Sequence, residues 1–385
     1  MNQELIQQIE GYKEIADELA VCRKYGIDYS LEKGKVRELV NRLHPSRMKL
    51  CVNDVFQESP SSKTFRLVSG SGLMPPFQAG QYISVFLEIG RVRTSRAYSI
   101  SSPPNHAGYF DISVKNVEKG FAAPFILKKL KPGDSIETSG PSGNFYFNPL
   151  IHDKTMVMLA GGSGITPFMS MIREITECGI DRTVYLFYGN RSDKDVMFHD
   201  ELTRISGRFK NVKYIPVLEN KSRKIDCACG YIDGKLIKRV LRSLSGKTFY
   251  VCGPSAMYDF CVPELEKLGV SAKKIRRESY GPPRHISSSP GWPSGIKENT
   301  VFNVNVSGRN TIQARAGEPL LTSLERAGIL VPSLCRSGEC SMCRVKLLSG
   351  KIFQPEGVMI RRSDSRYGYI HSCAAYPLED LSILI

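Results

Sequence analysis

The sequence predicts a multidomain protein, in which a short helical N-terminal extension precedes an antiparallel β-barrel, a parallel α/β sheet and a small α+β domain. Three observations predict this order. The spacing of apolar residues changes along the chain, a Pro-, Ser- and Gly-rich stretch interrupts it late, and four cysteines crowd its last fifth. With 385 residues, the chain has material for about two or three domains. Its 41% hydrophobic and 24% charged residues exclude a collagenous, low-complexity or largely disordered chain.

Residues 1–46 form the predicted N-terminal extension. Apolar side chains recur at helical spacing over 3–25 and again over 31–43, which predicts two amphipathic helices. The dipeptide His44-Pro45 ends the second helix, because proline cannot continue it.

Residues 47–151 form the predicted barrel. Short apolar segments are separated by Gly, Pro and Ser, at the spacing typical of a small antiparallel barrel or sandwich. The expected strands lie at 51–58, 64–70, 82–89, 109–115 and 134–140, and a further strand ends near residue 99.

Residues 152–280 alternate strands with helices, which predicts a parallel sheet covered on both faces. The expected strands lie at 155–160, 183–189, 212–218 and 247–254, and the expected helices at 167–178, 198–206 and 233–243.

Residues 281–298 read as a linker, because they are rich in Pro, Ser and Gly and show no periodicity. The only tryptophan, Trp292, is expected there as a docking contact rather than a catalytic group. Residues 299–385 then form the α+β domain, with a helix at 318–328.

The formal net charge of +15 is spread over every segment of the chain. A diffuse basic surface fits an acidic protein partner or anionic cofactors, and no nucleic-acid recognition motif accompanies it, so nucleic acid binding is not expected. Membrane insertion is not expected either, because no apolar run reaches about 18 residues. The eleven cysteines and the acidic start of the chain favour a reducing, cytoplasmic location.

The cysteine spacing is the strongest chemical signal. Cys335-x4-Cys340-x2-Cys343, followed by Cys373, is the plant-type [2Fe-2S] spacing, in which a tight loop supplies three thiolates and a distant segment the fourth. A zinc site would favour paired C-x2-C units at both ends, which the sequence lacks. Gly338 lets the loop backbone turn closely around a cluster.

A Gly-rich turn follows the strand at 155–160. Gly161, Gly162 and Gly164 let backbone amides approach a pyrophosphate, Thr166 is expected to cap the next helix, and Pro167 to occupy its first position. Taken alone, the motif is also compatible with a purely structural turn.

Two further motifs stand at strand ends. Cys252-Gly253-Pro254, followed by Met257, places a thiol at the carboxyl end of a central strand, where open α/β sheets bind ligands. In Arg96-Ala97-Tyr98-Ser99, the arginine can pair with a phosphate, the tyrosine can stack on a flat ring and the serine can hydrogen-bond a ring nitrogen.

In this order and spacing, the motifs of residues 51–280 resemble the ferredoxin-NADP reductase superfamily, and the cysteine segment resembles a plant-type ferredoxin domain. The resemblance implies a six-stranded Greek-key barrel that binds flavin, a Rossmann-like NAD(P) domain and a β-grasp ferredoxin domain.

The resemblance also implies binding residues. The implied flavin contacts are Arg96, Ala97, Tyr98, Ser99, Ser101, Val114, Lys115, Gly120, Phe121, Ala122 and Ala123. The implied nucleotide contacts are Gly161, Gly162, Gly164, Thr166, Pro167, Asn190, Arg191, Cys252, Gly253, Pro254 and Met257.

Four residues receive catalytic roles from the resemblance. Ser99 would hydrogen-bond flavin N5 and Cys252 would position the donor carbon, while Glu278 and Tyr280 match an E-x-F/Y found near the flavin in relatives. For Glu278, a surface salt bridge is the alternative.

The chain departs from the family pattern in two places. The second flavin loop, Gly120-Phe121-Ala122-Ala123, lacks the hydroxyl of the usual G-x-x-S/T. FAD is still favoured over FMN, because RAYSISSPP and SGPSGNFYF look like the FAD branch. The common members lack the N-terminal helices, which would pack on the barrel, dimerise the chain or dock an electron acceptor.

The donor is NADPH or NADH. Arg191 and Ser192 follow the second strand of the α/β sheet and can hold a 2′-phosphate, which slightly favours NADPH, whereas Asp193 nearby opposes it.

The sequence therefore predicts an NAD(P)H-dependent reductase that passes electrons through flavin and a [2Fe-2S] cluster to a separate acceptor protein. The unassigned sequence holds no terminal catalytic constellation, so substrate chemistry is expected in that partner. The alternative is a redox-responsive interaction protein that signals through its N-terminal helices.

Overall fold

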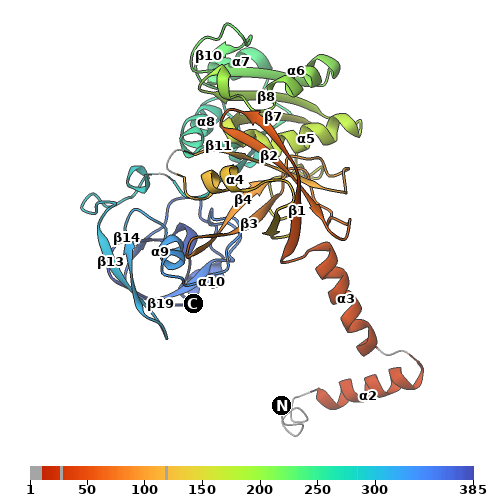
Figure 1. Ribbon diagram of the computed structural model, residues 1–385, viewed down its shortest axis with the longest axis vertical. Helices are drawn as coiled ribbons and strands as arrows, with labels where there is room; N and C mark the ends of the chain where they lie inside the picture. The colour runs from red at the N-terminus through yellow and green to blue at the C-terminus, as the bar shows by residue number, and fades with distance from the viewer. Residues whose placement is uncertain (1–10, 27–28, 118–119, 284) are drawn as a thin grey trace. The chain divides into compact units, whose positions relative to one another are not determined.

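The computed structural model describes residues 11–26, 29–117, 120–283 and 285–385 (Figure 1). The chain divides into two compact units, Met1–Ser46 and Arg47–Ile385, which are treated separately. In the first unit, helix α2 spans Tyr12–Lys24 and helix α3 spans Tyr29–Leu43, so α3 ends directly before His44-Pro45 as expected. The start of the first expected helix lies outside the described residues. None of the described helices is long and apolar enough to cross a membrane.

The second unit begins with a six-stranded antiparallel barrel. Its strands are β1 Met48–Ser59, β2 Ser62–Ser69, β3 Tyr82–Ile89, β4 Val92–Ser99, β5 Phe110–Lys115 and β6 Ser135–Thr138, in the order β4-β3-β6-β1-β2-β5. An isolated bridge between Ile100 and Ile112 joins the two outer strands and closes the sheet. Side chains such as Phe65, Ile83 and Val85 are fully buried inside it. The predicted antiparallel barrel is confirmed.

Helix α4, Ala122–Lys129, covers the barrel and was not predicted from the sequence. It starts within residues 120–123, which the sequence predicted as the second flavin loop, and Pro124 lies in its first turn, where a missing N–H costs no hydrogen bond. Its side chains Ala122 and Ile126 join the barrel core. The first turn of α4 therefore occupies the segment that the sequence predicted as a loop.

The next sheet is entirely parallel, in the order β10-β9-β8-β7-β11-β12. The strands are β7 Thr155–Gly161, β8 Thr183–Asn190, β9 Val212–Leu218, β10 Ala228–Cys229, β11 Lys247–Gly253 and β12 Ile275–Ser279. Helices α5 Thr166–Glu177 and α6 His199–Arg208 pack on one face, and α7 Gly234–Leu241 and α8 Ser255–Lys267 on the other (Figure 1). The strand order reverses between β7 and β11, and such a switch point opens a ligand crevice at the carboxyl ends of the strands.

Helix α8 was also absent from the sequence prediction. It contains Pro263, which removes one helical hydrogen bond and ordinarily ends a helix. The helix continues because Cys261, Val262 and Leu265 are buried against the sheet, and tertiary packing outweighs local propensity.

The C-terminal domain has a mixed sheet in the order β14-β13-β19-β15-β17, beside the small pair β16-β18. Its elements are β13 Val301–Val306, β14 Thr311–Arg315, α9 Leu320–Arg326, β15 Arg344–Ser349, β16 Ile352–Phe353, α10 Arg362–Arg366, β17 Tyr369–His371, β18 Tyr376–Pro377 and β19 Leu381–Leu384. Helix α9 buries Leu320, Leu321 and Leu324 against the sheet. The predicted α+β domain is confirmed.

The segment predicted as a linker folds onto the C-terminal domain. The Trp292 ring meets Phe353 edge-on, with centroids 5.2 Å apart, and its Nε1 donates to the Ile296 carbonyl at 3.0 Å. Ile286 and Tyr376 are fully buried in the same cluster. Trp292 is therefore a docking contact, as expected.

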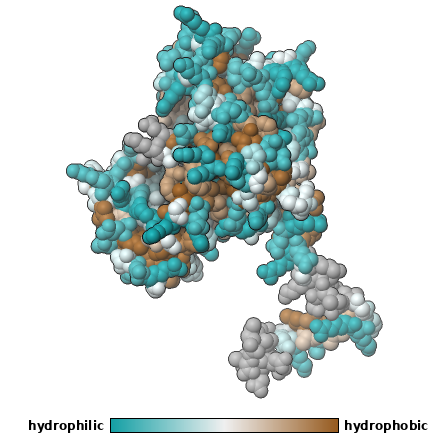
Figure 2. All heavy atoms as spheres, in the orientation of Figure 1, coloured by the Kyte–Doolittle hydropathy of each residue, from teal (hydrophilic) through white to brown (hydrophobic). Residues whose placement is uncertain are grey.

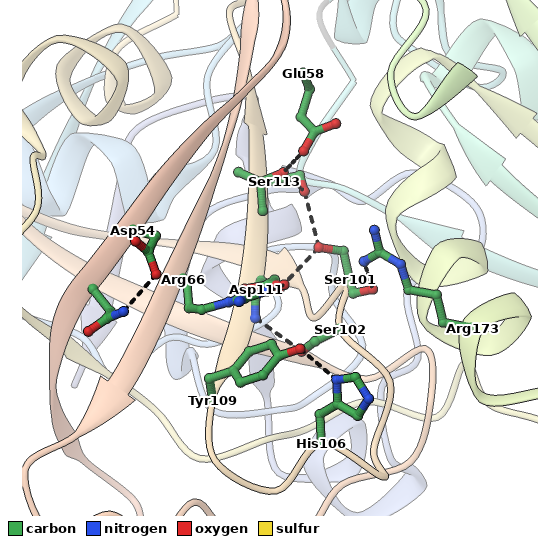
Figure 3. A network of polar contacts seen from close by, with 12 residues as sticks. Asp54, Glu58, Arg66, Ser101, Ser102, His106, Tyr109, Asp111, Ser113 and Arg173 are labelled. Atoms are coloured by element: carbon green, nitrogen blue, oxygen red, sulfur yellow. Dashed lines mark hydrogen bonds and ion pairs between the residues drawn. The ribbon is translucent and has the colours of Figure 1, made fainter. Parts of the chain in front are cut away.

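A polar network joins the barrel to helix α5 (Figure 3). Arg173 donates to the Ser101 carbonyl at 2.8 Å and forms a two-pronged ion pair with Glu201 at 2.7 and 2.6 Å. Ser170 donates to the Ser102 carbonyl at 2.7 Å, and the Ser102 hydroxyl accepts from the Asp111 amide at 3.0 Å. The bonds from Ser170 and Arg173 fix the chain directly after β4 against helix α5 of the parallel sheet.

Removing the tryptophan anchor tests the role of residues 281–298. We expect Trp292→Ala to lower the free energy of unfolding of the C-terminal domain by about 2–4 kcal/mol, because a large aromatic side chain leaves a packed cluster. The mutant should also be cleaved faster by trypsin within 281–298, as followed by mass spectrometry. Tyr231→Ala, at a ring that is 64% exposed, is the control. Cleavage at the same rate in both variants would contradict a docked linker.

Candidate functional site

The two glycine-containing motifs meet at the switch point of the parallel sheet. A Cβ on Gly164 would lie 2.1 Å from the Cys252 carbonyl oxygen. A Cβ on Gly253 would lie 2.6 Å from the Met257 Sδ and 3.2 Å from the Gly161 Cα. Only glycine allows this approach of backbone to backbone. One continuous surface thus forms next to the start of helix α5 from two segments about 90 residues apart, 161–164 and 252–253. We call this surface the floor of the site.

The expected cap at Thr166 was wrong. A 3-10 turn, Gly162–Ile165, runs directly into α5, so the N-cap residue is Ile165, which has no capping side chain. Thr166 is the first helical residue, and its hydroxyl donates to the Ser163 carbonyl at 3.1 Å instead of accepting from an amide. Pro167 stands second. The Thr166 amide donates to the Ser163 carbonyl and Pro167 has no amide hydrogen, so an anion at this helix start would be bound by amides of the turn rather than by the first amides of α5.

Three predicted catalytic side chains come together from three strands. Ser99 ends β4, Cys252 lies in β11, and Tyr280 follows β12. The Ser99 Oγ and the Tyr280 hydroxyl are 2.5 Å apart, and the Tyr280 hydroxyl also hydrogen-bonds the Cys252 thiol. Burial raises the pKa of the Cys252 thiol well above its usual value, so Cys252 is a neutral group suited to contact rather than to nucleophilic attack.

Glu278 is buried, with 5% of its surface exposed, so the alternative of a surface salt bridge does not describe it. Burial raises the pKa of its carboxyl well above the usual value, and the nearby Glu339 and Cys335 raise it further. Sequence reasoning missed Tyr258, whose hydroxyl accepts from the Gly253 amide at 3.0 Å and donates to the Glu278 carbonyl. A lone tyrosine after Met257 carries no motif that would have identified it.

The Arg96 guanidinium fits a phosphate. It donates to the Thr94 hydroxyl at 2.7 Å and to the Ser95 carbonyl at 2.6 Å, which are neutral oxygens. Burial, followed by the charge of Arg336, lowers the pKa of Arg96 to about 10. A half-buried cation held only by neutral groups is stabilised by a phosphate anion. Tyr98 packs beside it against the barrel core.

The second flavin loop supplies amides in place of the missing hydroxyl. Helix α4 begins at Ala122, its N-cap Phe121 offers no capping side chain, and the amides of its first turn are suited to a pyrophosphate. Val117 and Phe121 are 41% and 48% exposed beside it. Figure 2 shows hydrophobic side chains gathered on the face of the barrel where α4 lies. This chain's residues therefore fit a dinucleotide flavin.

Other residues assigned to flavin are engaged by the protein. The Ser101 hydroxyl donates to the Asp111 carbonyl at 3.2 Å, and Val114 is buried in the barrel core. Lys115 pairs with Asp195 at 2.9 Å, within the 3-10 turn Asp193–Asp195. Of the nucleotide residues outside the floor, Pro254 caps α8, while Asn190 and Arg191 lie at the carboxyl end of β8. Both polar atoms of the Asn190 side chain are buried without a hydrogen-bond partner in the described chain.

The four cysteines converge as the spacing predicts. The Cys335 thiol is within hydrogen-bonding reach of Cys340 and Cys373, and that of Cys343 is within reach of Cys373. The amides of Ser337 and Cys340 each donate to the Cys335 Sγ at 3.4 Å. Four clustered thiols with amide donors fit a [2Fe-2S] cluster. Cys335, Cys343 and Cys373 are buried, whereas Cys340 is partly exposed, so the most accessible edge of the cysteine cluster lies at Cys340.

Comparison with known proteins names each domain. Residues 49–147 match the oxidoreductase FAD-binding domain, 158–262 the oxidoreductase NAD-binding domain and 304–378 the 2Fe-2S iron-sulfur cluster binding domain. The solved phthalate dioxygenase reductase superposes with a TM-score of 0.64 and 25% identity, covering 88% of this chain and 98% of that one. The chain belongs to the ferredoxin-NADP reductase superfamily. In this superfamily it is an NAD(P)H-dependent oxidoreductase that holds FAD and, in its C-terminal ferredoxin domain, a [2Fe-2S] cluster.

Two curated relatives align with this chain over nearly their whole length. NADH oxidoreductase HCR of Escherichia coli is 28% identical over 340 residues, which are 88% of this chain and 97% of the relative. The glycine betaine monooxygenase reductase subunit of Pseudomonas aeruginosa is 26% identical over 347 residues, covering 86% of this chain and 93% of the relative. The alignments therefore extend over nearly all of each reductase.

The backbone contact at Gly164 yields a sharp test. Gly164→Ala forces a methyl group onto the Cys252 carbonyl, so we expect the free energy of unfolding to fall by about 2 kcal/mol or more and the KM for NAD(P)H to rise. Gly207→Ala is the matched control, because a Cβ there meets nothing and α6 gains about 0.5–1 kcal/mol. Equal KM values in the two variants would show that the floor does not hold nucleotide.

Proposed function

We propose that this reductase delivers electrons from its cluster to a separate acceptor protein, the terminal component of an oxygenase or of another redox enzyme. The supporting observation is the position of strand β4. Its end meets the nucleotide domain through Ser99 and Tyr280, and its middle meets the ferredoxin domain through Thr94. When bound, FAD takes a hydride from NAD(P)H and releases electrons one at a time.

The protein positions the reactants. Ser99 is placed to hydrogen-bond the flavin, and the neutral Cys252 thiol to contact the nicotinamide without reacting with it. Tyr280 holds these two side chains together, and Tyr258 fixes the backbone of Gly253 beneath them. The half-exposed Cys340 marks the exit side of the cluster.

The acceptor class rests on the relatives and on charge. One relative is named as the reductase subunit of a monooxygenase and the solved structure as the reductase of a dioxygenase. A net charge of +15 favours association with an acidic acceptor. None of the eleven cysteines forms a disulfide and seven of them lie outside the cluster, which fits a reducing compartment, so we place the protein in the cytoplasm.

Helix α2 favours a second candidate function, signalling to a partner. It buries none of its residues, and Ile15 and Val21 are 59% and 55% exposed. Turnover separates the two functions, because a signalling protein need not reduce added acceptors rapidly.

Cys340→Ser tests the exit route. We expect reduction of cytochrome c to fall at least about tenfold, because the cluster loses a ligand, while NAD(P)H still reduces ferricyanide through the flavin. The exposed Cys178, at the end of α5, provides the control Cys178→Ser. Full cytochrome c reduction by a Cys340→Ser protein without cluster iron would refute exit through the cluster.

For the donor we propose NADPH. Strand β8 ends in Asn190 without the acid that would favour NADH, and the exposed Arg191 follows it. Asp193, the nearest acid, accepts a hydrogen bond from Ser222 at 2.6 Å. The loop that carries Ser222 adds the exposed Lys221 and Arg223 to this edge of the sheet.

Competition by nucleotide fragments tests the donor. We expect 2′,5′-ADP to inhibit at least about tenfold more tightly than 5′-AMP, a difference of about 1.4 kcal/mol from one phosphate contact. Arg191→Gln should remove most of this difference. Lys210 lies just before the amino end of β9, at the edge of the sheet opposite to Arg191. Lys210→Gln should therefore leave the difference in inhibition unchanged. Equal inhibition of the wild-type protein by both fragments would identify NADH as the donor.

A further inference from the structure

A buried polar chain of four residues, Arg96, Thr94, Arg336 and Glu325, connects the flavin barrel to the cluster loop. The Thr94 hydroxyl donates to the Glu325 Oε2 at 3.0 Å and accepts from Arg96 at 2.7 Å and from Arg336 at 3.4 Å. Arg336 also makes a two-pronged ion pair with Glu325, at 2.6 and 3.0 Å. Thr94, Glu325 and Arg336 are each at most 7% exposed.

The cluster loop lies along the barrel through further contacts. The Ser95 and Ser333 hydroxyls are 3.0 Å apart, and Ser84 donates to the Leu334 carbonyl at 2.9 Å. Arg336 directly follows the cluster ligand Cys335, and its backbone is held at a φ of 57°, in the left-handed region. Residues bound to the barrel therefore flank Cys335 on both sides, so the position of the cluster relative to the barrel depends on them.

The charges of this chain do not balance. Arg336 and Glu325 form an ion pair, but at Arg96 the positive charge of Arg336 lowers the pKa more than the charge of Glu325 raises it, and the hydrogen-bond acceptors of Arg96 are neutral. Arg96 and Arg336 repel each other in this buried setting. Without the Glu325 carboxylate or without a flavin phosphate, one of the two arginines lacks a compensating negative charge. Arg96 is the residue placed to bind the flavin phosphate. A phosphate there compensates the charge that docking of the cluster loop brings near Arg96.

We propose that Thr94, Glu325 and Arg336 are positioning residues that seat the cluster loop on strand β4, and that FAD binding and ferredoxin-domain docking strengthen each other through Arg96. The proposal rests on the proposed function, in which electrons pass from flavin to cluster. The coupling is reciprocal: FAD tightens docking of the loop, and docking of the loop tightens binding of FAD.

The test uses Thr94→Val in the full-length, cluster-loaded protein. Valine keeps the shape of threonine but removes the hydroxyl that both arginines and Glu325 share. We expect flavin reduction by NAD(P)H, at saturating FAD, to stay within about twofold of wild type, cluster reduction to slow at least about tenfold, and the Kd for FAD to rise at least about threefold. Thr311→Val, which makes the same substitution at an exposed strand position of the ferredoxin domain, is the control.

Two further measurements keep the proposal testable if valine perturbs folding. Arg336→Lys retains the charge but loses the two-pronged pair, and we expect the same direction of change with an unaltered cluster circular dichroism spectrum. In the wild-type protein, adding FAD to the flavin-free form should slow hydrogen exchange in residues 333–336.

Separate outcomes identify which idea fails. If cluster reduction and FAD affinity in Thr94→Val and Arg336→Lys equal those of wild type, the positioning role is wrong. Unchanged exchange in 333–336 on adding FAD would overturn the coupling. If NAD(P)H reduces the flavin but never the cluster of the wild-type protein, the proposed function itself fails.

Discussion

The packing of strand β4 against both of its neighbouring domains is the interaction on which the candidate site depends. NAD(P)H gives up electrons as a pair, whereas a [2Fe-2S] cluster takes them singly, so the flavin must stand between the two. The last residue of β4, Ser99, meets Tyr280 of the nucleotide domain, and Thr94 in its middle meets Glu325 of the ferredoxin domain. One strand thus sets the placement of both electron-transfer steps.

Burial disfavours the ionised forms of the side chains on the hydride side of the site. Burial raises the pKa of Cys252, Glu278 and Tyr280 well above their usual values. These side chains can therefore shape the nicotinamide pocket by contact and hydrogen bonding without attracting water or reacting. The charged groups are placed elsewhere, at Arg96 for the phosphates and in the Arg336–Glu325 pair beside the cluster.

Local patterns predicted a large part of this molecule. The alternation of strand and helix patterns identified β7, β8 and β9, and the cysteine spacing identified four side chains that do converge. Helix α8 was not predicted, and it continues through Pro263 because burial of its apolar face outweighs the hydrogen bond lost there. The cap at Thr166 was wrong because a 3-10 turn replaced the expected helix start.

Contacts between domains had no local signature. Thr94 and Arg336 are 242 positions apart, and neither residue type signals the other in the sequence. Tyr258 likewise stands in a helix whose existence the sequence did not indicate, yet its hydroxyl joins Gly253 to Glu278. Such residues emerge only when the domains are assembled, because their role depends on packing rather than on periodicity.

Anaerobic stopped-flow absorbance of the cluster-loaded protein, mixed with NADPH or with NADH, tests the central claim most directly. The account predicts that the flavin bleaches first and the cluster second, because the flavin stands between the donor and the cluster. Cluster bleaching without prior loss of flavin absorbance, or a reduced flavin that never reduces the cluster, would contradict it.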